Sequence, residues 1–158
     1  MQQILIKLEN KMEFLSGKFL CETIVPKNEL IVSRTNLKGV ITYANDTFAE
    51  ISGYSVDELI GKNHNIVRHP DMPKVIFKDL WTKLKAEGHW SGFVKNLRKD
   101  EGFYWVYAEI SQVIKNGELV EYKSVRTPMS FEDKIKYQLY YDELREKNKE
   151  LLRRVIYQ

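Results

Sequence analysis

The feature that most constrains the fold is a succession of three strand-length runs in the second half of the chain. They cover residues 90–97, 103–114 and 119–127 and are rich in aromatic and β-branched side chains. The connections between them are short, and the second contains Asn116-Gly117, a pair that favours a tight hairpin turn. Consecutive strands joined in this way lie side by side and run antiparallel. We therefore expect an antiparallel sheet that ends with these runs.

The residues before these runs predict a further hairpin and several short helices. Residues 29–33 and 40–43 have strand character and are separated by a turn. Residues 45–51 then show helical spacing, Ser55 begins a capping box, and residues 75–86 form a longer helical pattern. Strands and helices segregated in this order are typical of the α+β class. We expect a five-stranded antiparallel sheet with short helices on one face.

Both ends of the chain show the spacing of amphipathic helices. The first stripe comprises Ile4, Leu8, Met12, Leu15 and Phe19. The second resembles a heptad seam and comprises Tyr137, Tyr141, Leu144, Asn148, Leu151 and Val155. A polar Asn148 at an a-type position is a device that fixes the register of paired helices. We expect a homodimer formed through these helices, the alternative being that both helices fold back onto their own sheet.

Length and composition indicate one domain with appendages. We expect an N-terminal helix and linker in residues 1–27, a central domain in 28–129, and a C-terminal helix or short coiled coil in 130–158. The net charge of +3 is scattered, which argues against nucleic acid as a partner. Apolar runs fall short of the roughly 20 residues that span a bilayer, so no membrane span is expected. A single cysteine, Cys21, excludes an internal disulfide and a cysteine-based metal cluster, and it fits the cytoplasm.

Three stretches of the central domain resemble the PAS domains of aerotaxis receptors. They are YANDTFAEISGYSVDELIGKNHNIVRHPDMP, WSGFVKNLRKDEGFYWV and YKSVRTPMS. The first half of the first stretch is general to PAS domains and points to the fold without identifying a ligand. HNIVRHPDMP followed by WSGFVKN is much narrower, and it is similar to the FAD-binding PAS domain of aerotaxis transducers. The resemblance therefore implies a PAS fold that holds FAD non-covalently, with a helix at each end.

The resemblance also implies which residues form the cofactor site. It assigns FAD retention to the arginine, histidine and aspartate of R-H-P-D, which here are Arg68, His69 and Asp71. It implicates Asn45 in FAD binding, and it assigns contact with the flavin ring to Trp90 and Asn96. His64 and Asn65, just before this motif, are further candidates.

The residue types in this region also suit a pocket for a planar ligand. Such a ligand needs an apolar pocket with a few fixed polar groups, and Trp81, Trp90 and Tyr104 offer aromatic surface. The Asn96 amide offers a donor and an acceptor together, and Arg68 suits a pyrophosphate. For Trp81, simple packing in the core is the competing interpretation.

A photochemical thiol adduct, haem binding and catalysis are the competing chemistries. Light-sensing flavin PAS domains carry an adduct-forming cysteine where this chain has residues 63–66, which contain none. Haem held by a histidine, with His64, His69 and His89 available, remains an alternative, as does a PAS module that binds partners with no ligand. No phosphate-binding loop or hydrolase motif is present, so we expect no enzyme activity.

We expect the chain to sense redox or energy state for motility. Aerotaxis transducers carry a membrane anchor, a HAMP segment and a kinase-control domain after the PAS domain, and we expect this protein to lack them. It would then need a separate, membrane-bound chemoreceptor-type transducer, as in the two-part energy-taxis systems that it also resembles. We expect a cytoplasmic protein that meets the membrane only through this partner.

Overall fold

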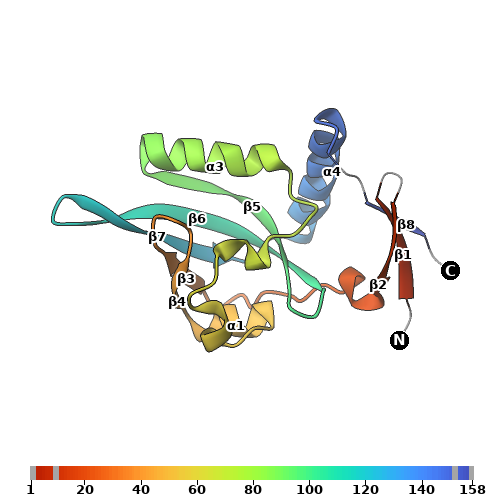
Figure 1. Cartoon of the computed structure of the whole chain (residues 1–158), viewed down its shortest axis with the longest axis horizontal. Helices are drawn as coiled ribbons and strands as arrows, with labels where there is room; N and C mark the ends of the chain where they lie inside the picture. The colour runs from red at the N-terminus through yellow and green to blue at the C-terminus, as the bar shows by residue number, and fades with distance from the viewer. Residues whose placement is uncertain (1–2, 9–10, 151–152, 157–158) are drawn as a thin grey trace.

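The computed structural model describes residues 3–8, 11–150 and 153–156 (Figure 1). Its main feature is a five-stranded antiparallel sheet. From edge to edge the strands are β4 (Ile41–Ala44), β3 (Ile31–Thr35), β7 (Glu118–Thr127), β6 (Phe103–Lys115) and β5 (His89–Leu97). Asn116 and Gly117 both have positive φ, at 52° and 78°, as a tight hairpin turn between β6 and β7 requires. The predicted α+β class and sheet are confirmed.

The helical elements between β4 and β5 form the layer over one face of this sheet. They are α1 (Asp46–Ser52), α2 (Val56–Leu59), the 3-10 helix η2 (His64–Val67) and α3 (Lys74–Glu87). Asn45 caps α1 by accepting a hydrogen bond from the backbone N–H of Phe48, and Ser55 caps α2 by accepting one from Glu58. The helix starts expected from the sequence are therefore present.

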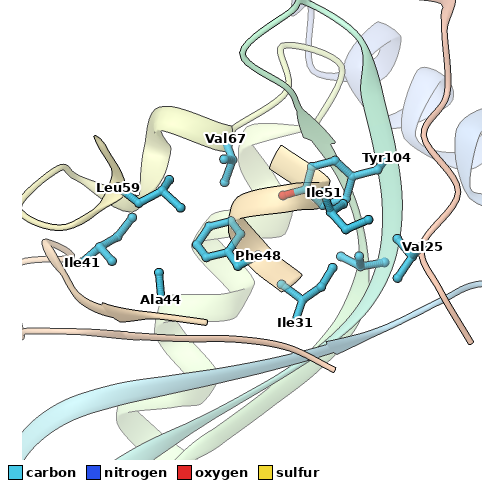
Figure 2. Packing of buried hydrophobic residues seen from close by; sticks show 10 residues of the cluster. Val25, Ile31, Ile41, Ala44, Phe48, Ile51, Leu59, Val67 and Tyr104 are labelled. Atoms are coloured by element: carbon cyan, nitrogen blue, oxygen red, sulfur yellow. The ribbon is translucent and has the colours of Figure 1, made fainter. Parts of the chain in front are cut away.

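The core between the sheet and these helices forms around Phe48. Figure 2 shows its ring among Ile41, Leu59 and Val67 on one side and Ile51 on the other. A neighbouring cluster lies beneath α3 and contains Leu80, Leu84, Trp90, Ala108 and Tyr122. The space between the two clusters is bordered by η2 and α3, and the candidate site lies there.

The prediction of an N-terminal helix from Ile4 to Phe19 is wrong. Residues in this segment form β1 (Gln3–Leu8) and β2 (Lys11–Ser16), followed by the short 3-10 helix η1 (Gly17–Leu20). β1 pairs with β2 along its whole length and also with β8 (Arg153–Ile156), which gives a separate three-stranded sheet. Pairing with a segment from the other end of the chain is invisible to local spacing, and it overrode the helical pattern.

The prediction that the C-terminal seam forms a coiled coil is also wrong. α4 (Phe131–Lys147) is capped by Ser130 and ends at Asn148, whose side chain bonds back to the Leu144 carbonyl. Tyr137 and Tyr141 pack on the sheet, where Tyr141 stacks near Trp105. Of the other predicted seam positions, Val155 is in β8, and Leu151 lies outside the described residues. The helix therefore folds back, as the alternative held, and the homodimer remains an untested prediction.

α4 lies on the opposite face of β5 and β6 from the helical layer. Side chains alternate between the faces of a strand, so Phe93 faces α4 while Val94 faces the cavity. The Tyr141 hydroxyl donates to the Phe93 carbonyl at 2.5 Å. Burial raises the pKa of this hydroxyl, with the neighbouring tyrosines adding to the effect.

No helix among the described residues is long and apolar enough to span a membrane.

Candidate functional site

A cavity of about 320 Å³ lies between the helical layer and the sheet. Its floor comes from β3, β5, β6 and β7, and its walls come from η2 and α3. Strand alternation explains the floor, because Ser33, Thr35, Val94, Asn96, Ala108 and Ile110 all point to the same face. Ligand sites in proteins begin at about 300 Å³ and combine apolar walls with a few fixed polar groups. This cavity has both properties.

Five of the predicted site residues line the cavity: His64, Asn65, Arg68, Trp81 and Asn96. They come from η2, the residue that follows it, α3 and β5, so segments that are separate in sequence meet at one place. Trp81 packs edge-on against Tyr122 and remains partly exposed, so it forms wall rather than interior core.

Three other predicted residues lie outside the lining and have structural partners. Besides capping α1, Asn45 accepts from the Val32 N–H and donates to the Leu30 carbonyl, which joins α1 to β3. The Trp90 indole N–H donates to Asp79 at 3.1 Å. Tyr104 is fully buried in the Phe48 cluster, and this burial raises its pKa to about 12.

The remaining two predicted residues, His69 and Asp71, also lie away from the lining. His69 is 1% exposed, and its Nδ1 accepts a hydrogen bond from the Asp71 backbone N–H at 3.0 Å. The Asp71 carboxylate faces Lys95 of β5 and Arg145 of α4. Both residues therefore shape the loop that follows η2.

Arg126 is a charged, buried cavity residue that the sequence analysis missed. It lies on β7, is 2% exposed, and its guanidinium lies over the Phe48 ring at 4.4 Å. It donates to Ser33 Oγ at 2.8 Å and to His64 Nε2 at 3.1 Å. Alternation along β7 places Tyr122, Ser124 and Arg126 on one face, and this was the signal that could have found it.

Charge and burial set the protonation of this polar group. Burial first, and the Arg126 charge second, lower the pKa of His64 to about 3. Its Nε2 is then an acceptor, and the ring proton resides on Nδ1. Burial lowers the pKa of Arg126 to about 10, which leaves the guanidinium charged at neutral pH. The cavity thus holds a fixed cation beside a neutral imidazole.

The mouth of the cavity is polar and basic. Arg68 lies with its guanidinium 3.7 Å from the centre of the Phe77 ring, and burial lowers its pKa although Glu150 opposes this. Lys38 and Lys123 also line the cavity, the first exposed and the second half-buried. Such a rim suits an extended anionic group of a ligand whose apolar part lies inside.

In the described part of the chain no cluster of three or more His, Cys, Asp or Glu side chains could hold a metal ion.

Comparison with known proteins identifies the family. Residues 41–126, more than half of the chain, match the family model described as PAS fold. The chain therefore belongs to the PAS fold family. The light-state structure of the blue-light photoreceptor Aureochrome1 LOV is similar with a TM-score of 0.61 at 22% identity, over 75% of this chain and 91% of that one.

Two curated relatives share more of the sequence. The aerotaxis receptor of Escherichia coli (strain K12) is 48% identical over 103 residues, which is 65% of this chain and 20% of that protein. The nitrogen fixation regulatory protein of Klebsiella pneumoniae is 30% identical over 109 residues, or 68% of this chain and 22% of that protein. The chain thus spans about a fifth of the length of these relatives. Their similarity, with the fold, supports a PAS sensory domain.

Proposed function

We propose that the cavity binds FAD non-covalently, with the flavin ring system inside and the phosphates along the basic mouth. The main support for this proposal is the burial of the Arg126 guanidinium, a cation that faces the cavity. Among the described residues, its side chain forms hydrogen bonds with a neutral serine and a neutral histidine and packs over the Phe48 ring, and no carboxylate forms an ion pair with it. A buried charge is costly unless a counter-group is supplied. A ligand with an electron-rich polar edge, such as a flavin, would supply one.

The other polar groups of the cavity suit the same ligand. Asn96 is 5% exposed and can donate to and accept from one edge of a ring. The apolar side chains Val94, Leu80 and Leu84 offer the flat walls that an aromatic ring system needs. The likeness of HNIVRHPDMP and WSGFVKN to FAD-binding PAS domains makes FAD the specific choice.

We further propose that the chain senses redox or energy state and signals to a separate chemoreceptor-type transducer. Bound flavin would supply reversible electron uptake. The protein would contribute Arg126, which stabilises added negative charge on the ring, and Asn96 and His64, which offer hydrogen bonds to it. The identity to an aerotaxis receptor supports this role, as does the regulatory nature of the second relative.

Haem is less well supported by the geometry. His64 is the histidine that lines the cavity, and its Nε2 lies 3.1 Å from both the Arg126 guanidinium and Ser33 Oγ. Axial ligation of haem iron needs the lone pair of a ring nitrogen. The lone pair of His64 Nε2 already accepts a hydrogen bond from the Arg126 guanidinium. Iron could bind there only after this contact breaks.

The decisive experiment is to purify the protein from flavin-replete cells and record its absorbance. We expect a yellow protein that releases intact FAD on denaturation, identified by chromatography. Arg126→Met should lose most of the flavin, while Lys115→Met, at the exposed hairpin, should retain it. A Soret band, FMN, or a colourless wild-type protein that does not take up added FAD would refute the proposal. The last result would favour a ligand-free interaction module.

A further inference from the structure

A group of charged side chains lies where three segments meet, on the far side of β5 from the cavity. Asp71 belongs to the loop between η2 and α3, Lys95 to β5, and Arg145 to the last turn of α4. Their side chains are 13%, 10% and 5% exposed, respectively. At this depth an ion pair is only weakly screened by solvent, so removing one member weakens the packing of the other two.

Asp71 joins the other two because each carboxylate oxygen faces a different cation. Lys95 Nζ donates to Oδ2 at 3.0 Å, and Arg145 Nη1 donates to Oδ1 at 3.3 Å. Lys95 also donates to the Gln138 side chain at 2.9 Å, and Arg145 pairs with Asp142 on its own helix. Hydrogen bonds between charged groups are the stronger class. They tie the loop, the strand and the helix together.

The same loop is part of the cavity wall. Arg68 lines the cavity and forms an antiparallel β-bridge with Asn96, which also lines it. Because side chains alternate along a strand, Asn96 faces the cavity while its neighbour Lys95 faces α4. The Lys95 N–H donates to Met72 Sδ at 3.3 Å, so the loop follows the edge strand β5 from Arg68 to Met72.

A second contact joins the end of this loop to the segment after α4. The backbone N–H of Lys74, the first residue of α3, donates to the Glu150 carboxylate at 3.0 Å. A carboxylate is favourable at a helix N-terminus, where N–H groups lack partners within the helix. The C-terminal region therefore contacts this part of the chain at two points, Asp71 within the loop and Lys74 at the start of α3.

We propose that the Asp71–Lys95–Arg145 cluster couples occupancy of the cavity to docking of α4, with Asp71 as a positioning residue and not a ligand contact. This inference rests on the proposed function for the identity of the ligand. A ligand that contacts both Arg68 and Asn96 would keep the loop against β5. Because Asp71 and Lys95 lie on the same two segments, the ligand would also fix their positions at the contact with α4. The coupling is reciprocal, because docked α4 must strengthen ligand binding by the factor by which the ligand strengthens docking.

The test uses Arg145→Met, which removes the contact with Asp71 from the α4 side at a position that is not part of the cavity lining. Lys147→Met is the matched control, since it removes an exposed cation two residues further along the same helix. Hydrogen–deuterium exchange is measured in α4 and in residues 64–72, with FAD bound and after FAD has been removed. The dissociation constant of FAD is measured by fluorescence titration.

We expect Arg145→Met to exchange faster both in α4 and in residues 64–72, and to bind FAD about tenfold more weakly, within the usual range of coupling between sites. FAD should slow exchange in α4 of the wild type, and this effect should be lost in the variant. Lys147→Met should match the wild type in every measurement. Faster exchange in α4 alone, with exchange in residues 64–72 and FAD affinity unchanged, would overturn the coupling.

Two further outcomes are informative. If the wild type binds no FAD, the proposed function fails, while exchange in residues 64–72 of flavin-free Arg145→Met still decides whether α4 is coupled to the cavity wall. If Arg145→Met does not fold, Arg145→Lys replaces it. This variant keeps the charge with fewer donors and should show the same changes at smaller size. Wild-type behaviour of folded Arg145→Lys at the loop would then count against the proposal.

Discussion

Acidification should destabilise the flavin-free protein through His64, and His64→Gln should be less sensitive. The imidazole accepts from the Arg126 guanidinium, and its pKa is lowered from its usual 6.5 to about 3. In the unfolded chain the same group titrates near 6.5. Between these two values the unfolded chain binds a proton that the folded protein excludes. The stability present above pH 6.5 is therefore lost progressively as the pH falls towards 3.

The magnitude follows from the size of this window. Each unit of pH below the unfolded pKa lowers the free energy of unfolding by about 1.4 kcal/mol. At pH 5 the full effect would be about 2 kcal/mol relative to pH 7. The His64 ring borders a cavity that admits solvent, which weakens the desolvation, so we expect a loss of about 1–2 kcal/mol. Glutamine can accept from Arg126 through its amide oxygen but does not titrate.

The assay is urea unfolding at pH 7 and pH 5 of flavin-free wild type, His64→Gln and His89→Gln. His89 is exposed at the start of β5, so its variant should keep the wild-type pH dependence. Comparing variants removes the contributions of all other titrating groups, because the proteins share them. An equal loss of stability in wild type and His64→Gln would refute the reasoning, since His64 would then not be held neutral by its surroundings.

Three further predictions follow from the site and its supports. Asn96→Ala should weaken FAD binding by about 1 kcal/mol or more, because a buried hydrogen-bonding partner is lost; unchanged affinity in a titration would remove Asn96 from the site. Gly92→Ala should lower the free energy of unfolding by about 1–3 kcal/mol through overpacking. The added Cβ would lie 2.5 Å from the Trp90 indole, and wild-type stability would contradict that packing. Light scattering at tens of micromolar tests the homodimer predicted from the sequence, and a monomeric mass would contradict it.

The central fold could be predicted because its signals are local. Alternation along 90–97, 103–114 and 119–127, with Asn116-Gly117 between the last two runs, allows little other than an antiparallel sheet. The capping box at Ser55 also acts within a few residues, and the structure has it in place. The termini could not be predicted in this way, because β1 pairs with a strand from the opposite end of the chain.

At the site, the sequence patterns and the family resemblance indicated which segments carry polar and aromatic groups, and they pointed to His64, Arg68 and Asn96. Which side chains line the same cavity follows only from the folded chain. In the fold, Arg126 is buried beside His64, and the Asp71 carboxylate faces Lys95 and α4. The physical reason is that a side chain's face depends on strand pairing and on the packing of distant helices, and a motif records neither.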